Sequence, residues 1–291
     1  MNIILSRKGF DSSAGQIPSI ILPDGRLFSF PIPDKKGNVK YSAIKSPIPE
    51  YRNLFELLSD LYKGKKKEKF NEKHLCHLDP DINPESIDRP QYWKPLFGQI
   101  SAAQSHLMSR KVGVGDIFLY FGWFRQTEYY GDKIRYVPGS TDRHIIYGYL
   151  VVGDMININN PENKVDEWMK RHVHFHLRED CKLNSLYVSA DHFNLNGISY
   201  PGSGIFKYHD KLVLTKTGQP NRSLWELPKA FFPFKNNRTP LSCHEKPKRW
   251  ELKNDCVQLQ SVGRGQEFII DIIEYPELES WVNTIISTLG K

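Results

Sequence analysis

The stretch ILSRKGFDSSAG, residues 4–15, places a polar loop directly after a short apolar run. The loop contains two cations, two hydroxyls and one carboxylate: Arg7, Lys8, Ser12, Ser13 and Asp11. Glycines, cations and hydroxyls after a strand follow the physical logic of a phosphate-binding loop. Asp11 beside the cations would stay ionised and could act as a catalytic carboxylate. The alternative is an ordinary strand exit in which Asp11 and Ser12 bond nearby backbone amides.

A second stretch, HLCHLDPDI at residues 74–82, alternates His77, Asp79 and Asp81. In an extended segment, alternate side chains leave the same face. Such a set suits a divalent metal ion, or a pair of carboxylates whose mutual repulsion raises one pKa for acid–base work. Asp-Pro-Asp is equally an ordinary turn sequence, so both interpretations stay open.

Three more histidines alternate in RHVHFH at residues 171–176. If this segment is a strand, His172, His174 and His176 share a face. A single strand rarely supplies three ligands to one ion, and a zinc site also needs groups that orient its ligands. We therefore expect one or two of these histidines to line a pocket and the other to be solvated.

Aromatic side chains alternate through GDIFLYFGWFR at residues 115–125. Trp123 could stack on a planar base while Arg125 holds its phosphate, although alternate aromatics in a strand usually pack in the core. The small-residue segment FGQISAAQSHL adds His106 to this group. Further along, SVGRGQEFIID contains Arg264, Gln266 and Glu267, and its glycines permit either a close approach to a ligand or a structural bulge.

The chain has 291 residues and a formal net charge of +7, which favours an anionic partner. The densest basic block, KGKKKEKFNEK at residues 63–73, has the composition of a solvated loop or helix end. Four cysteines without CxxC spacing exclude a zinc ribbon or disulfide framework and predict reduced thiols. The sequence has neither a signal peptide nor an apolar run long enough to cross a bilayer, so we expect a cytoplasmic protein with no membrane partner.

The hydrophobic patterns predict an α+β protein with a strongly bent mixed sheet or barrel and helices packed around it. Expected helices cover 50–64, 97–111 and 277–290. Expected strands cover 2–5, 25–34, 115–125, 143–154, 172–177, 185–190, 204–208, 211–216 and 266–273.

Blocks spread over nearly the whole chain resemble the third nucleotide-modification-associated domain family. They are ILSRKGFDSSAG, PSIILPDGRLFSFPIPD, HLDPDI, FGQISAAQSHL, GDIFLYFGWFR, IIYGYLVVGD, SLWELPKAFF and GRGQEFIIDI. The resemblance implies one such domain over residues 1–291, in a phage or bacterial DNA-modification or defence setting. It implies a nucleotide or DNA as partner, together with other modification-system proteins, and it favours the phosphate-binding interpretation of the first loop.

We therefore expect three groups of site residues. The catalytic candidates are Asp11, Asp79, His106 and Glu267. The nucleotide- or phosphate-binding candidates are Arg7, Lys8, Ser12, Ser13, Gln104, Trp123, Arg125, Arg264 and Gln266. The candidate ligands for a divalent metal ion are His77, Asp79 and Asp81, and no dinucleotide or P-loop fingerprint names another cofactor.

Three functions fit these residues. The first is an enzyme that modifies or processes a nucleotide or a base in DNA. A second, weaker resemblance, to PUA-like and EVE-like barrels over about 110–216, supports a non-catalytic reader of modified bases. The third is a metal-dependent nuclease or nucleotide hydrolase using His77, Asp79 and Asp81.

Overall fold

The computed structural model describes residues 1–62, 71–177, 181–232, 238–263 and 267–290. Its main sheet has the strand order β18-β1-β8-β10-β11-β7, and β2, β3, β9 and β14 extend it. The strands on this path are β1 (Asn2–Arg7), β7 (Leu96–Ile100), β8 (Ile117–Tyr130), β10 (Arg143–Asn157), β11 (Asn184–Ser189) and β18 (Glu267–Asp271). β1 and β2 pair with β8 in parallel and the other pairs on this sheet are antiparallel, so the sheet is mixed as predicted.

The sheet curls strongly into a half-barrel. Register shifts interrupt the pairing of β10 between Ile146 and Gly148, and again between Val152 and Asp154. Such bulges bend a strand and increase its twist. At Gly148 a Cβ atom would lie 2.5 Å from Ile82 Cδ1, so glycine permits the close packing at the first bend. The curl brings the two end strands of the sheet together, where Gln99 Nε2 donates a hydrogen bond of 2.6 Å to Glu267 Oε1.

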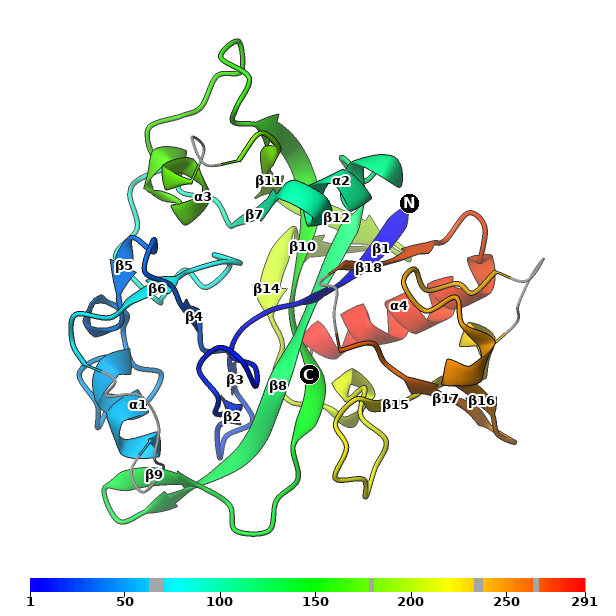
Figure 1. Cartoon of the computed structure of the whole chain (residues 1–291), viewed down its shortest axis with the longest axis horizontal. Coiled ribbons are helices and arrows are strands. Elements are labelled where there is room, and N and C mark those ends of the chain that lie inside the picture. The colour runs from blue at the N-terminus through cyan, green and yellow to red at the C-terminus, as the bar shows by residue number, and fades with distance from the viewer. Residues whose placement is uncertain (63–70, 178–180, 233–237, 264–266, 291) are drawn as a thin grey trace.

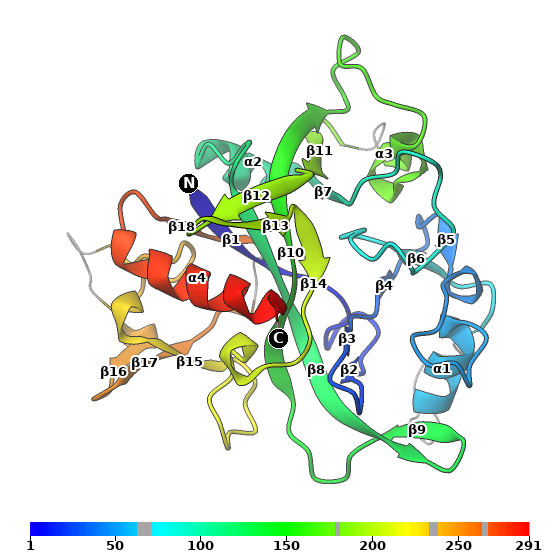
Figure 2. The ribbon, with the colours of Figure 1, turned by 180° about the vertical axis from the view of Figure 1, so that it is seen from behind.

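Smaller elements lie on both sides of the long strands β8 and β10 (Figures 1 and 2). On one side are α1 (Leu54–Leu61), β2 (Ser19–Ile21), β3 (Leu27–Phe28), β4 (Ile32–Pro33), β5 (Val39–Lys40), β6 (Leu75–His77) and β9 (Lys133–Tyr136). On the other are α4 (Glu279–Ile286), β15 (Leu224–Pro228), β16 (Trp250–Leu252) and β17 (Cys256–Gln260). The hairpin β12 (His192–Leu195) and β13 (Ile198–Pro201) and the strand β14 (Ser203–Ile205) follow β11.

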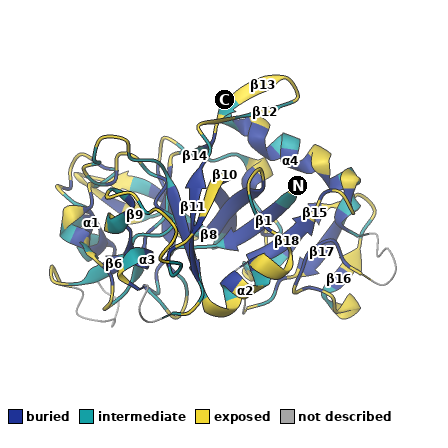
Figure 3. Ribbon diagram, turned by 90° about the horizontal axis from the view of Figure 1, so that it is seen from above, coloured by how far each residue is buried: buried dark blue, intermediate teal, exposed yellow. Residues whose placement is uncertain are grey.

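Two helices follow directly from sequence patterns. The predicted leucine stripe of α1 is buried, and Asn53 caps the helix by accepting a hydrogen bond from Glu56 N at 3.1 Å. In α4, Trp281 and Ile285 pack into the main core. Figure 3 shows that the central strands are mostly buried and that exposed residues concentrate at the periphery. None of the described helices is long and apolar enough to span a membrane.

Three predicted elements were wrong in type or extent. The helix expected over 97–111 is α2 (Ser101–Ser109), because residues 96–100 pair with β11 as a strand. Residues 172–177 form no strand, because His172 caps the short helix α3 (Val173–His176). Residues 211–216 form a 3-10 turn and two isolated bridges instead of a strand. Of the basic block at 63–73, residues 63–70 lie outside the described residues.

One core histidine, His244, is held neutral by its burial. Its side chain is fully buried beside Trp225 and Phe268. Nδ1 lies 2.9 Å from the Ser242 carbonyl oxygen, to which it donates, and Nε2 accepts from Val262 N at 3.2 Å. Burial lowers the pKa of His244 to about 4.

This histidine should make the fold sensitive to acid. Between its folded pKa and the ordinary value of about 6.5, the unfolded chain binds the extra proton, so stability falls as the pH falls through this window. From pH 7.5 to pH 5.0 we expect His244 to account for a loss of about 2 kcal/mol in the free energy of unfolding. Urea unfolding at both pH values checks this. The loss should shrink in His244→Leu and persist in His176→Ala, which changes an exposed histidine, and equal losses in all three proteins would contradict it.

Candidate functional site

A buried lysine between two buried carboxylates forms the centre of the candidate site. Lys8 Nζ lies 3.3 Å from Glu267 Oε1 and 3.9 Å from Asp79 Oδ2, and 4.3 Å from the ring centroid of Phe97. The Lys8 side chain is 9% exposed, and those of Asp79 and Glu267 are 3% and 1% exposed. Charges this deeply buried are strongly coupled, because little water screens them.

The strand register brings the polar groups of this centre to one face of the sheet. Ser6 on β1 stands opposite Glu267 on β18 and opposite Tyr120 on β8. Lys8 follows two residues after Ser6, so it leaves the chain on the same side. Ser6 Oγ, Tyr120 Oη and Glu267 Oε2 are buried and have no hydrogen-bond partner among the described residues. Buried polar atoms are nearly always hydrogen-bonded, so these three mark a place where a polar ligand gains contacts.

Three imidazoles surround the Asp79 carboxylate. His77 Nε2 lies 3.2 Å from His174 Nε2, and His174 Nε2 lies 3.9 Å from Asp79 Oδ2. His172 Nε2 lies 3.4 Å from Asp79 Oδ1, which also accepts a hydrogen bond of 2.7 Å from Gly98 N. Potential ligand atoms of His77, Asp79 and His174 all lie within 4.8 Å of one another. These three residues could therefore hold a metal ion.

Further side chains orient these groups and set their charge. Asp34 Oδ2 lies 3.0 Å from His77 Nδ1, and Asn184 Oδ1 lies 3.2 Å from His174 Nδ1. Burial lowers the pKa of His174 to about 3, against the opposing effect of Asp79. Burial also opposes ionisation of Asp79, yet the neighbouring His172 imidazole and the charge of Lys8 hold the pKa of Asp79 below its ordinary value. The site thus combines an anionic carboxylate with a neutral imidazole.

Two predicted residues on α2 lie beside this centre. Burial and Arg110 lower the pKa of His106, and Glu267 partly offsets the effect, while His106 Nε2 lies 3.1 Å from Ser242 Oγ. Gln104 is fully buried and its Oε1 accepts a hydrogen bond of 3.0 Å from Tyr187 Oη. The structure therefore groups Lys8, His77, Asp79 and Glu267, with His106 and Gln104 next to them.

Other predicted residues make different contacts. Asp81 forms an ion pair with Arg89, and its backbone pairs with Leu96. The cluster that could hold a metal ion contains His174 where the sequence suggested Asp81. Asp11 Oδ1 accepts hydrogen bonds from the backbone amides of Ser13 and Ala14 and from the Ser13 hydroxyl, as in the ordinary strand exit that the sequence left open.

Two of the remaining predicted phosphate-binding residues, Ser12 and Trp123, contact Arg222, which the sequence reasoning missed. Its guanidinium lies 4.2 Å from the Trp123 ring centroid and donates a hydrogen bond to Ser12 Oγ. Arg7 donates to the carbonyl oxygens of Val262 and Gly263, and Arg125 forms an ion pair with Asp142. Arg264 and Gln266 lie outside the described residues.

Sequence reasoning also missed residues that complete the centre: Asp34, Gln99, Tyr120 and Asn184. No local motif marks them, because each is an ordinary strand or turn residue until the fold brings it to the cluster. For His172 and His174 a signal existed in RHVHFH, where one or two histidines were expected to line a pocket. Both are buried, whereas His176 is exposed.

A groove and a small cavity adjoin each other, and the small cavity reaches Asp79. The groove has a volume of about 620 Å³, and its walls include Phe28, Trp93 and Phe206 and the cations Arg26, Lys45 and Lys207. The small cavity, of about 50 Å³, reaches Gly9, Asp79 and Tyr147. The two share six wall residues, Leu27, Phe28, Ile82, Asn83, Ser86 and Ile205, so they adjoin along a common wall.

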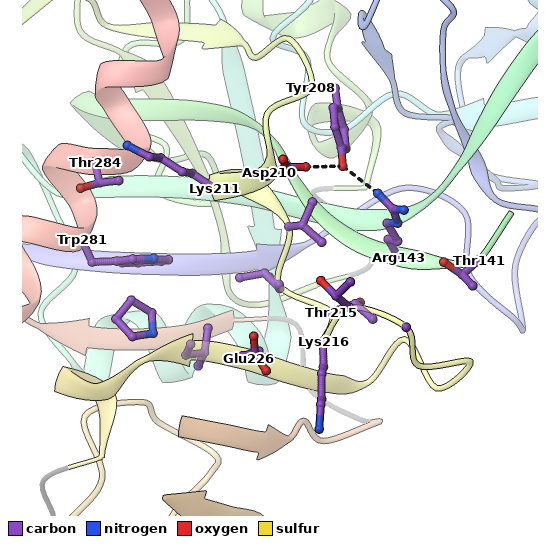
Figure 4. Close-up of a pocket in the computed structure, with 16 residues that line it drawn as sticks. Thr141, Arg143, Tyr208, Asp210, Lys211, Thr215, Lys216, Glu226, Trp281 and Thr284 are labelled. Carbon is purple, nitrogen blue, oxygen red and sulfur yellow. Dashed lines mark hydrogen bonds between the residues drawn. The ribbon is translucent and has the colours of Figure 1, made fainter. Parts of the chain in front are cut away.

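A separate polar cavity of about 590 Å³ is lined by Arg143, Lys211, Lys216, Glu226 and Trp281 among others (Figure 4). There Arg143 donates a hydrogen bond to Tyr208 Oη, which in turn donates to Asp210. The central lysine, carboxylates and histidines do not line this cavity. It therefore provides matched control positions for experiments on the groove.

The fold and the site together define the class of this protein. It is an α+β half-barrel that buries acidic, basic and imidazole side chains near the place where its two end strands meet. The family model of nucleotide modification associated domain 3 matches residues 2–271, and the chain belongs to that family. Its role is thus associated with nucleotide modification. No curated protein and no solved structure matches the chain, and the predicted PUA-like or EVE-like core gains no support.

Gly98 is required for the position of His174. A Cβ atom at this glycine would lie 2.2 Å from His174 Cγ, and its amide holds Asp79. We expect Gly98→Ala to displace the imidazole and to destabilise the fold by about 1–3 kcal/mol, the usual cost of overpacking. Gly113→Ala is the matched control, because the nearest atom to its Cβ would be 4.0 Å away. Chemical denaturation checks both, and a Gly98→Ala protein as stable as Gly113→Ala would contradict the prediction.

Proposed function

We propose that this protein is an enzyme that modifies a nucleotide or a base in DNA, acting as a single domain over residues 1–291. The family supports a nucleotide-modification-associated role. The observation that carries the proposal is Lys8 held between the buried carboxylates of Asp79 and Glu267, beside the imidazoles of His77 and His174. Burying such groups together costs free energy, and proteins tolerate that cost mainly at functional sites.

In this proposal Glu267 exchanges a proton with the substrate. Gln99 bonds Oε1, whereas Oε2 is buried and without a partner among the residues described, so it is the oxygen left for a substrate group. Tyr120 Oη and Ser6 Oγ on the same face would orient that group by hydrogen bonds. Lys8 stabilises negative charge that develops during the reaction, and its effect is strong because the site excludes water.

The groove is the proposed substrate-binding site. Its volume of about 620 Å³ lies in the range of small-molecule sites. The aromatic walls suit a planar base, and Lys207 on the same walls suits a phosphate, whereas Arg26 and Lys45 form ion pairs with Asp24 and Asp88. The small cavity shares a wall with this groove and is lined by Asp79.

Loss of the Glu267 carboxylate should abolish the reaction. We expect Glu267→Gln and Lys8→Met to lower the yield of modified nucleoside by at least about 100-fold, the usual contribution of acid–base and electrostatic groups. The control is Glu226→Gln, an exposed carboxylate at the separate cavity. Nucleoside mass spectrometry of DNA and of free nucleotides, from cells that produce each variant, measures the yield. The proposal fails if the wild-type protein leaves both pools unchanged.

Groove substitutions should weaken binding of nucleotides. Loss of stacking on Phe28 removes about 1–3 kcal/mol, so Phe28→Ala should raise the Kd at least about fivefold. Lys207→Glu should also weaken binding, whereas Lys216→Glu at the separate cavity should not. Fluorescence titration with a labelled mononucleotide and, separately, with single-stranded DNA distinguishes the two sources of substrate. Equal weakening by Lys207→Glu and Lys216→Glu would contradict the assignment of the groove.

The reader alternative uses the same groove without chemistry. It predicts that Glu267→Gln retains full binding while the wild-type protein changes no nucleoside. An aromatic cage at Trp123 is a weaker basis for it, because Arg222 covers that ring.

A further inference from the structure

We infer that His77, His174 and Asp79 bind one divalent transition-metal ion. The inference rests on the contact between two imidazole nitrogens, His77 Nε2 and His174 Nε2, at 3.2 Å. Whether this contact is attractive depends on which ring nitrogens carry protons. The hydrogen bonds behind each ring decide that question.

The first ring is oriented by a carboxylate. His77 Nδ1 lies 3.0 Å from Asp34 Oδ2, and an ionised carboxylate accepts hydrogen bonds but cannot donate them. An aspartate carboxylate is ordinarily ionised at neutral pH. Nδ1 of His77 therefore carries the proton. In the neutral ring this leaves a lone pair on Nε2, directed at His174.

The second ring is oriented by an amide. Asn184 Nδ2 donates a hydrogen bond of 2.9 Å to the His174 carbonyl oxygen, which fixes the orientation of the amide. Asn184 Oδ1 then faces His174 Nδ1 at 3.2 Å and accepts its proton. His174 Nε2 therefore also carries a lone pair and no proton. Two lone pairs at 3.2 Å repel each other unless a cation lies between them.

The carboxylate completes a set of three ligands. Asp79 Oδ1 is engaged by Gly98 N and approached by His172 Nε2, while Oδ2 faces His174 Nε2 at 3.9 Å. Each proposed ligand thus has a partner behind it that fixes its orientation, as in protein metal sites. Lys8 supplies one formal positive charge beside the two carboxylates of Asp79 and Glu267. A cation between the imidazoles would reduce the negative charge that remains there.

The ligand types define the class of metal. Two imidazoles and one carboxylate form the set that binds catalytic Zn²⁺ or non-haem Fe²⁺ and leaves positions open for water or substrate. Mg²⁺ and Ca²⁺ prefer oxygen ligands throughout. A bound ion of the transition series would lie beside Lys8 and could polarise a substrate oxygen or lower the pKa of a bound water. This chemistry deepens the proposed function, although metal binding does not depend on it.

Titration of chelator-treated full-length protein with Co²⁺ tests the inference. Visible absorption and calorimetry should give one Co²⁺ per chain for the wild-type protein, with no competition from Mg²⁺. His77→Ala and His174→Ala should weaken binding at least 100-fold, and Asp34→Asn should weaken it about 10- to 100-fold by removing the group that orients His77. Two control variants should bind Co²⁺ as tightly as the wild-type protein does. They are His176→Ala, which changes an exposed histidine on the same helix as His174, and Asp81→Asn.

Two results would overturn the inference. One is a wild-type protein that does not bind one Co²⁺ per chain. The short contact between the two imidazoles would then be explained by a proton shared between His77 and His174. The other is wild-type affinity in His77→Ala and His174→Ala. Circular dichroism of each variant separates loss of the ligand from loss of the fold, and His77, whose side chain is 15% exposed, is the substitution the fold tolerates better. Stoichiometric binding with unchanged nucleosides would refute the proposed function and leave the metal site supported.

Discussion

The arrangement of this protein depends on the buried charge of Lys8. This one ammonium group links Asp79, which follows β6, to Glu267 at the first position of β18, and it lies over the ring of Phe97 on β7. Removing one member of a buried ion pair commonly costs about 3–5 kcal/mol, because the partner charge loses its compensation. Three chain segments distant in sequence are therefore held in fixed relation by electrostatics as well as by packing.

The curl of the sheet makes this link possible. Bulges in β10 bend the long strands, so that β7 and β18 meet through Gln99 and Glu267 although they are at opposite ends of the strand order. The polar groups consequently lie on an inner, water-poor face, where each charge and hydrogen bond has a large effect. A flatter sheet would place the same residues in solvent, where water would screen their charges.

Several features could be predicted from local patterns. Hydrophobic periodicity, which neighbouring residues alone determine, predicts three kinds of element. They are the aromatic runs that form β8 and β10, the first strand, and the leucine stripe of α1. HLCHLDPDI correctly drew attention to His77 and Asp79 as neighbours in one cluster. Asp81 is not part of this cluster, because its carboxylate pairs with Arg89 and its backbone forms a bridge to Leu96.

The sequence by itself determined the family, the α+β class and the presence of acids, histidines and cations outside the apolar runs. Only the tertiary structure decided which of them meet. It brought His174 and Glu267 to Asp79 and Lys8, whereas Asp11 stays within its own turn and Arg125 pairs with Asp142. The reason is physical, because hydrophobic periodicity is encoded over a few neighbouring residues. A charged centre instead requires contacts between segments that are far apart in the sequence, up to 259 positions for Lys8 and Glu267. Those contacts depend on the strand register and on the curl of the sheet.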